Sequence, residues 1–468
     1  MRMEGLEEDA KPTIRFPVAH PDHDTVSIQP QQIASLIRRR RKKFPPERLP
    51  WFDQWLAARG PTLRSLVSTA RDALGKHEKD NGARRRARRE DDQRRYEIAV
   101  ETVVANLAHS ALFNVTDKRL AILTGNKPRG FTRYDNDALG KPLRRLLGDL
   151  EALGLVEWRW SPQRGVASSM APTERLSAMV REAGITREDF GRQNSEEVIL
   201  LSRKRKMGEW RDSRTERDWV NYTDTAETNA MRADMRRINA WLEDAAISFE
   251  DDGGEPVDVH DRTLRRMFMI HEGDPLEQRF DLSGRLYGGF WQNLKRKRRA
   301  GIGIDGEPVA LLDYSSMFTR LAYASKGIEP PNGDLYAIPG LEQHRNAVKV
   351  GVNALLFARR TLGRWPSTEE DDQQPPAGWT MPRFRKALID YHPAISDCFG
   401  TGLGYSLMHI ESEIMVRVLT QLASEKVVAL PLHDGMLVRR FDTAIGREVM
   451  EKVSKEVTSF ILPVTESA

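Results

Sequence analysis

Cysteine, long apolar runs and a hydrophobic leader are scarce or missing in this sequence. Its 468 residues include one cysteine, Cys398, which excludes a disulfide framework and a cysteine-based zinc finger and fits a reducing compartment. No apolar run approaches the ~18 residues that a membrane-spanning helix needs, and the first residues lack the apolar core of a secretory signal. We therefore expect a soluble, cytoplasmic protein without membrane partners.

The charge of the chain is unevenly distributed. The 73 Lys and Arg against 68 Asp and Glu give a net charge of +5. Residues 36–95 alone contain 19 basic and 8 acidic side chains, so this segment carries +11 and the remainder −6. Such a segment binds nucleic acid phosphates without reading sequence; the alternative is a solvated, flexible linker. The length indicates two to four domains, and we predict a disordered lead over 1–35 and a basic arm or linker over 36–95.

Residues 96–225 predict a small domain and, from residue 200, a polar connector. Helices are expected over 96–114 and 137–153, and the second is followed by a glycine, the alternating sequence LVEWRW and a turn. This succession resembles a winged-helix domain. The resemblance implies DNA contacts from the second helix through Lys141, Arg144 and Arg145. A small α/β support domain without DNA contact is the alternative.

Two predicted strands in the C-terminal half each deliver an aspartate. Asp313 follows the apolar run Val309–Leu312, and Asp434 follows Val427–Leu432 with His433 between. Carboxylates on neighbouring strands can share two Mg²⁺ ions, the arrangement used in phosphoryl transfer. Each aspartate alone could equally be a turn former.

Between the two aspartates lies a helix with two cations on one face. Arg345 and Lys349 are four residues apart, and this spacing places them one above the other. A guanidinium fork and an ammonium suit a triphosphate. The alternative is a solvated helix face.

The order of these elements resembles motifs A, B and C of family A DNA polymerases and their single-subunit RNA polymerase relatives. The matching residues are Asp313-Tyr314-Ser315, Arg345-x-x-x-Lys349 and His433-Asp434. Ser283-Gly284-Arg285-Leu286 with Gln292-Asn293 resembles the stretch before motif A, and the helix around Met408–Ile414 resembles the primer-template helix. The resemblance covers residues 226–468. It implies an α+β, right-hand polymerase core with an antiparallel palm sheet, helical thumb and reduced fingers.

The resemblance also implies a role for each matching residue. Asp313, Asp434 and the carbonyl of Tyr314 would bind two Mg²⁺ ions, with Mn²⁺ as a substitute. Arg345 and Lys349 would hold the incoming triphosphate, and Lys349 would protonate pyrophosphate. The primer and template would be contacted by Arg285, Gln292 and His433. The basic run Lys295, Arg296, Lys297 and Arg298 follows directly, and we favour phosphate contacts over a plain charged turn.

Some positions depart from the family pattern. Gly435 stands where the DNA polymerases have Glu, Asn353 replaces an aromatic residue, and Phe357-Ala358 replaces Tyr-Gly. The family places the side chain that meets the nucleotide 2′ carbon five residues after the first aspartate, which here is Phe318. This ring would exclude a ribose hydroxyl; its alternative role is packing in the helix core. Phe318, Asn353 and Phe357 are thus predicted nucleotide contacts.

Together these features predict a DNA-directed DNA polymerase that adds dNTPs to the primer of a primer–template. We expect it to be nucleoid-associated and to serve replication or repair of a phage or mobile element. A single-subunit RNA polymerase or primase is one alternative, and a non-catalytic DNA-binding replication initiator is the other. The sequence identifies no protein partner.

Overall fold

The computed structural model of the chain describes most of its residues. The described residues are 49–82, 86–113, 118–124, 132–140, 142–162, 166–207, 214–254, 257–271, 273–274, 278–368 and 373–467. The predicted disordered lead and Lys141 lie outside them, as does the first part of the basic segment. Within the described residues, no helix is both long and apolar enough to cross a membrane.

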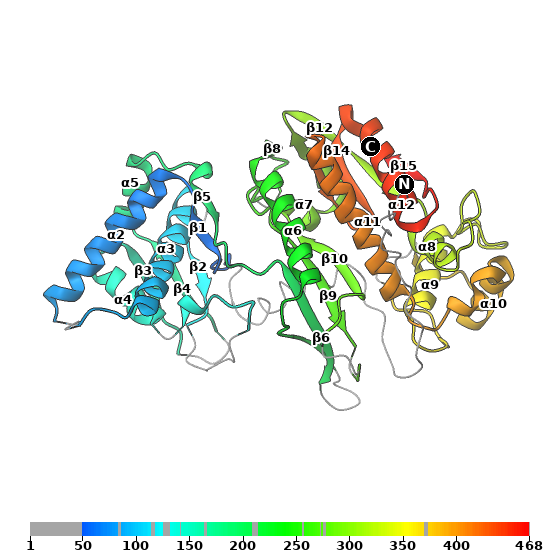
Figure 1. Cartoon of the computed structure of the whole chain (residues 1–468), viewed down its shortest axis with the longest axis horizontal. Helices are drawn as coiled ribbons and strands as arrows, with labels where there is room; N and C mark the ends of the chain where they lie inside the picture. The colour runs from blue at the N-terminus through cyan, green and yellow to red at the C-terminus, as the bar shows by residue number, and fades with distance from the viewer. Residues whose placement is uncertain are drawn as a thin grey trace, which may run out of the picture. The chain divides into compact units, whose positions relative to one another are not determined.

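The described residues form two compact units (Figure 1). Among the described residues, the N-terminal unit comprises 49–200 and Trp219–Thr223. The C-terminal unit comprises Leu201–Asp218 and Asp224–Ala468. The boundary therefore falls inside a strand, between Leu200 and Leu201.

The N-terminal unit is a helical domain with one small sheet. Its helices are α2 (Pro61–Asp80), α3 (Glu90–Phe113), α4 (Leu143–Ala152) and α5 (Glu174–Glu182), with the short η1 (Asp137–Leu139) and η2 (Arg187–Asp189). Its strands are β1 (Leu56–Ala58), β2 (Leu120–Ile122), β3 (Val156–Arg159), β4 (Ser168–Pro172) and β5 (Phe190–Arg192). The strands β2, β4 and β3 pair antiparallel in that order, and β1 pairs with β5.

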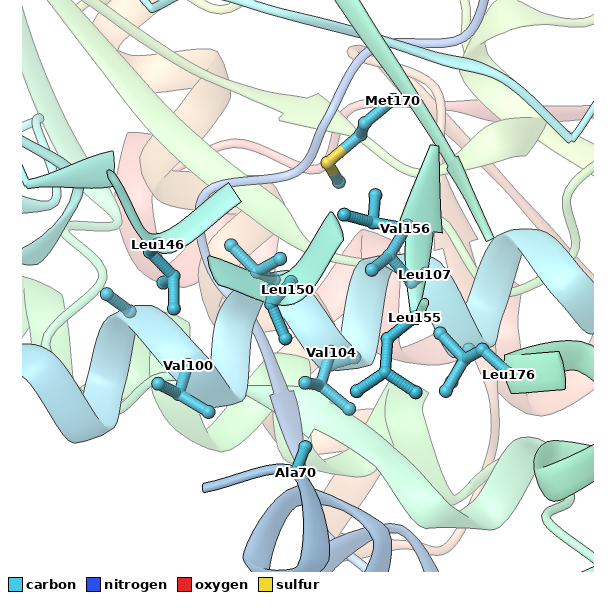
Figure 2. Packing of buried hydrophobic residues seen from close by; sticks show 14 of the residues in the cluster. Ala70, Val100, Val104, Leu107, Leu146, Leu150, Leu155, Val156, Met170 and Leu176 are labelled. Carbon is cyan, nitrogen blue, oxygen red and sulfur yellow. The ribbon is translucent and has the colours of Figure 1, made fainter. Parts of the chain in front are cut away.

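The core of this unit forms around α3. Val100, Val104 and Leu107 recur at helical spacing and are almost completely buried. They pack with Leu150 of α4 and Met170 of β4 in one cluster, as Figure 2 shows. The helical periodicity that predicted α3 and α4 therefore reflects burial against a common core.

Part of the predicted basic arm is instead an ordered helix. The helix α2 occupies residues 61–80 and buries Leu63, Leu66 and Leu74. These apolar side chains line one stripe, while most of the charged ones face solvent. A high density of charge on one face does not prevent a helix from packing with the other face, so the composition of this segment did not reveal the helix.

The C-terminal unit contains two antiparallel sheets and the remaining helices. Its strands are β6 (Ile199–Met207), β7 (Arg214–Trp219), β8 (Ile247–Phe249), β9 (Leu264–Ile270), β10 (Ser283–Gly288), β11 (Ile302–Ile304), β12 (Glu307–Tyr314), β13 (Ala429–Pro431), β14 (Gly435–Arg439) and β15 (Val464–Ser467). One sheet has the order β10-β9-β6-β7; the other has the order β13-β14-β12-β11-β8, with β15 also pairing with β12. Helices together with antiparallel sheets confirm the predicted α+β class.

The C-terminal unit also contains longer and shorter helices. The longer ones are α6 (Ala226–Asp244), α8 (Met317–Ser325), α9 (Arg345–Phe357), α10 (Met381–Tyr391), α11 (Gly404–Ser424) and α12 (Thr443–Thr458); the shorter ones are α7 (Phe290–Asn293), η3 (Arg296–Gly301), η5 (Pro393–Cys398) and η6 (Arg440–Asp442). The helix α11 contacts β10, β13, α6, α8 and α12, and Figure 1 shows it running past β10 and α12. It therefore links the two sheets.

Part of the predicted polar connector over 200–225 also forms regular structure. Most of β6 and β7 falls in this range and extends the sheet beyond β9. Ser202 is fully buried, and its hydroxyl donates a hydrogen bond to the carbonyl of Phe268 at 3.1 Å. Long Lys and Arg side chains can bury their methylene stems while lying on a strand. Because these side chains are polar, the hydrophobicity pattern did not predict a strand here.

Candidate active site

The two predicted metal-binding aspartates lie side by side on the sheet that contains β12 and β14. Asp313, near the end of β12, is paired in register with Gly435, the first residue of β14. The amide of Tyr314 donates a hydrogen bond to the carbonyl of Asp434 at 3.1 Å. Burial, and next the charge of Asp434, raise the pKa of Asp313 to about 7. Two carboxylates are therefore held close enough to repel each other.

The backbone on either side of this pair is strained. His433, just before Asp434, has a φ of 73°, and Ser316, which precedes α8, has a φ of 51°. Left-handed conformations are uncommon for residues with a Cβ atom and cluster at functional sites. The turns that present the carboxylates are thus held by the surrounding fold.

Packing explains why glycine stands at position 435. A Cβ atom built there would lie 2.6 Å from the carbonyl oxygen of Leu312 and 2.7 Å from a carboxylate oxygen of Asp313. Both distances are shorter than a van der Waals contact, so the two strands leave no room for a side chain. The glutamate of the family pattern does not fit at this position.

A third carboxylate, not predicted from the sequence, belongs to the same site. Glu411 of α11 is buried and accepts two hydrogen bonds from Arg285 of β10, at 2.6 and 2.7 Å. Burial raises the pKa of Glu411, Arg285 opposes this, and Asp434 adds to it. Although burial disfavours its charge, Arg285 has a raised pKa because Glu411 faces it. The available signal was the position of Glu411 on the apolar stripe of α11, four residues after Leu407.

The two predicted triphosphate ligands begin α9. Arg345 donates hydrogen bonds to both carboxylate oxygens of Asp334, at 2.7 and 3.2 Å, and both side chains are exposed. Lys349 is exposed one turn later. Its charge lowers the pKa of Asp313 and of Glu411, against the stronger effect of burial. Lys349 thus acts electrostatically on the acidic site, whereas Arg345 is engaged by Asp334.

Aromatic side chains form a row beside the acidic site. Phe318 of α8 contacts Phe357 of α9 at 5.2 Å between ring centroids, and Phe357 contacts Tyr405 of α11 at 5.1 Å. The guanidinium of Arg285 lies 5.3 Å from the centroid of Phe318. Phe318 is 8% exposed, so both its predicted roles, core packing and nucleotide contact, are compatible with its position. The buried amide oxygen of Asn353 on α9 has no hydrogen-bond partner among the described residues.

The predicted primer contacts are mostly engaged within the protein. Arg285 is buried and forms an ion pair with Glu411. Gln292 donates hydrogen bonds to the carbonyls of Pro431 (2.9 Å) and Leu286 (3.3 Å). His433 packs against Tyr287, with its Nδ1 atom buried and without a partner among the described residues. Burial and the nearby Arg285 lower its pKa, so the ring is neutral.

The predicted phosphate contacts differ in exposure. Lys295, Arg296 and Lys297 are exposed, whereas Arg298 forms an ion pair with Asp252 at 2.6 Å. In the N-terminal unit, Arg145 is exposed, but the Nε of Arg144 donates a hydrogen bond to the carbonyl of Thr124 at 2.8 Å. These side chains are therefore not equally available to a ligand.

The donors at the site suit a hard divalent cation. Asp313 and Asp434 offer carboxylate oxygens, which Mg²⁺ and Mn²⁺ prefer. A cation would offset both the burial and the repulsion by Asp434 that raise the pKa of Asp313. Among the described residues, no group of three or more His, Cys, Asp or Glu forms a metal site. Further ligands would have to be backbone carbonyls, water or substrate phosphates.

Comparison with known proteins does not assign a family. No family model matches the chain, and no curated protein matches it. Among solved structures, the chain is similar to the POL domain of Pol1 from M. smegmatis in complex with DNA primer-template and dNTP. The match has 10% sequence identity and a TM-score of 0.28, and it covers 88% of this chain and 66% of that chain. At that TM-score and identity, the similarity does not establish a shared fold.

Proposed function

We propose that the C-terminal unit is a template-directed DNA polymerase that adds dNTPs to the 3′ end of a primer. The observation that carries this proposal is the pairing of Asp313 with the start of β14, which sets two aspartates side by side. The order of the sequence motifs around them supports the same reaction. Bound between these carboxylates, divalent cations would activate the primer hydroxyl and neutralise charge on the phosphates.

The cations of α9 would bind the incoming nucleotide. Arg345 would exchange Asp334 for the triphosphate, because both ligands offer oxygen pairs to its guanidinium. Lys349 would contact the same phosphates and give the proton on its Nζ to the departing pyrophosphate. Both groups would stabilise charge that grows during the transfer.

The aromatic row would select the sugar. Phe318 is fixed by Phe357 on one side and Arg285 on the other. A rigid ring at the 2′ carbon would exclude a ribose hydroxyl and leave space for deoxyribose. We infer that Asn353 and Phe357 complete the nucleotide pocket.

The primer end would be positioned from the opposite side. His433 lies next to Asp434, and Arg285, on β10 of the other sheet, forms a neutralised pair with Glu411. Contact of Arg285 with the primer requires it to turn away from Glu411. Gln292 supports this region by tying β10 to Pro431.

The N-terminal unit would hold duplex DNA in the manner of a winged helix. Its chain order α3-β2-η1-α4-β3-β4 and its sheet order β2-β4-β3 support this proposal. The exposed Arg145 on α4 is a suitable phosphate contact. With Lys295, Arg296 and Lys297, it would make binding depend on salt.

Primer extension tests the proposal. A labelled primer–template is incubated with Mg²⁺ and either dNTPs or NTPs, using the wild type and the variants Asp313→Ala and Asp434→Ala. We expect dNTP extension by the wild type and a loss of at least ~10³-fold in each variant, since each removes a metal ligand. Lys452→Ala, an exposed change on α12, is the matched control. Equal activity of the aspartate variants would contradict the site.

The same assay separates the alternatives. Efficient use of NTPs by the wild type would indicate an RNA polymerase or primase, and gain of NTP use only in Phe318→Ala would support a sugar-selecting ring. DNA binding without any extension would favour a non-catalytic replication initiator. The ion pair between Arg285 and Glu411 favours that last function, because an Arg285 held by Glu411 does not contact a primer.

A further inference from the structure

Two largely buried cations on the four-stranded sheet lack an anionic partner. Lys204 lies on β6 and Arg217 on the adjacent strand β7. Among the described residues, neither forms an ion pair with a carboxylate. The Nη1 of Arg217 donates only to the thioether sulfur of Met267, at 2.5 Å, and its buried Nε has no partner among those residues.

The rings of Tyr405 and His271 lie next to these cations. The Nζ of Lys204 lies 5.5 Å from the ring centroid of Tyr405, and the ring of His271 packs on the same tyrosine at 4.7 Å. Burial, and next Arg217, lower the pKa of Lys204 to about 8. Burial, then Arg359 and Lys204, lower the pKa of His271 to about 4. At neutral pH, His271 is therefore uncharged, and Lys204 is charged at an energetic cost.

A buried charge without a counter-charge is unfavourable to folding. Proteins keep such groups where a ligand supplies the missing charge. A phosphate offers several oxygens, which can accept hydrogen bonds from both a guanidinium and an ammonium. The cationic pair thus fits a phosphate better than it fits a purely structural role.

We propose that Lys204 and Arg217, backed by Tyr405, form a binding site for a phosphate group in the backbone of a DNA strand. The identity of the strand rests on the proposed function. The aromatic row from Phe318 through Phe357 ends at Tyr405, so the site lies at the far end of that row from the acidic site. DNA is favoured over free nucleotide because Arg345 and Lys349 already suit the triphosphate.

DNA affinity is the first measurement. Lys204→Met and Arg217→Met remove the charges and keep the length of the side chains approximately. Binding of a labelled primer–template is followed by fluorescence anisotropy without divalent cations, over a range of salt concentrations. We expect each variant to bind about 3–10-fold more weakly and to lose about one from the slope of log affinity against log salt. Lys452→Met, which removes an exposed cation from α12, should change neither quantity.

Thermal stability is the second measurement, and it separates a ligand site from a structural one. Removing an unpaired buried charge should raise the melting temperature of the free protein by roughly 4–8 °C in Lys204→Met. DNA should then stabilise this variant less than it stabilises the wild type. A fall in the melting temperature of the free variants would contradict the proposal, because it would show that the cations support the fold.

The source of the phosphate is tested with dATP in equilibrium dialysis. Unchanged dATP affinity together with weaker DNA binding supports a site for the DNA backbone. Weaker dATP binding with unchanged DNA affinity would overturn it in favour of a triphosphate, and unchanged binding of both would overturn the site altogether. A wild type that binds DNA through these cations but extends no primer would support this site and contradict the proposed polymerase.

Discussion

The sheet β10-β9-β6-β7 carries buried or largely buried cations on both of its halves, but only one half pairs them with carboxylates among the described residues. On β10 and β9, Arg285 and Arg266 pair with Glu411 and Glu413 of α11, each at 2.6 Å. On β6 and β7, Lys204 and Arg217 have no such partner among the described residues. The first half uses its charges to fix α11 on the sheet. The second half leaves its charge for the phosphate group proposed above.

Cationic side chains of one sheet thus stabilise the fold in one half and, as proposed above, bind a ligand in the other. A neutralised arginine is locked by its partner, since two hydrogen bonds to one carboxylate define its orientation. An unneutralised one raises the energy of the free protein, and this energy is recovered when an anion binds. Substitutions that remove charge from either half of the sheet test this difference.

The largest effect should come from Glu411→Gln. This change leaves Arg285 buried beside a neutral amide, and we expect a loss of about 3–5 kcal/mol in the free energy of unfolding. Urea denaturation measures this loss. Replacing both partners, as in Arg285→Met with Glu411→Leu, should restore most of the stability. A single variant as stable as the wild type would show that the pair is not needed to hold α11.

The second effect concerns the pH dependence of Lys204. Its folded pKa, about 8, lies below the ordinary value for lysine, 10.5. The unfolded chain therefore binds more protons between these values, and the stability of the wild type should rise with pH over this window by about 2 kcal/mol. The groups that face Lys204 are Arg217, Tyr405 and His271. The difference between Lys204→Met and the wild type in urea denaturation should shrink from pH 7.5 to pH 10; a constant difference would contradict the prediction.

The third effect concerns the like-charged pair of the acidic site. Because the folded pKa of Asp313 is about 7, well above the ordinary 3.8, its contribution to stability is lost as pH rises from about 4 to 7. In metal-free buffer at pH 8, Asp313→Asn should therefore be about 1–2 kcal/mol more stable than the wild type. The gain should vanish near pH 4. Adding Mg²⁺ should stabilise the wild type but not the variant, and the same response in both would exclude Asp313 as a ligand.

The smallest effect should come from Arg298→Gln. Its guanidinium is already paired with Asp252, so we expect DNA affinity to change by less than about twofold. Arg296→Gln, which removes an exposed cation two residues away, should weaken binding more. Anisotropy at low salt compares the two directly, and the reverse order would indicate that DNA displaces Asp252.

Periodicity was enough to predict α3 and α4 of the N-terminal unit and the strands β12 and β13 near Asp313 and Asp434. It failed for α2, whose charged face dominates the composition, and for β6, where the run Arg203–Lys206 hides a strand. In both cases tertiary packing decided the outcome, because a neighbouring element covered the apolar side or supplied backbone hydrogen bonds. Local sequence carries no record of that neighbour.

The candidate site was predictable only where residues share a motif. The motifs named Asp313, Asp434 and Lys349, and the structure brings their charges into one electrostatic environment. Glu411 was missed, although its helix resembles the primer-template helix of the family, because its partner Arg285 is 126 residues away in the sequence. Lys204 was missed for the same reason, since the absence of a counter-charge is visible only in three dimensions.

The close approach of β12 and β14 at Gly435 also limits how this chain can evolve. Any substitution there adds an atom against the backbone of Leu312 and the carboxylate of Asp313, so an acidic residue at that position would require the two strands to move apart. Changes in the acidity of the site must instead arise on other elements. Position 411 is constrained as well, because Glu411 is buried in its ion pair with Arg285.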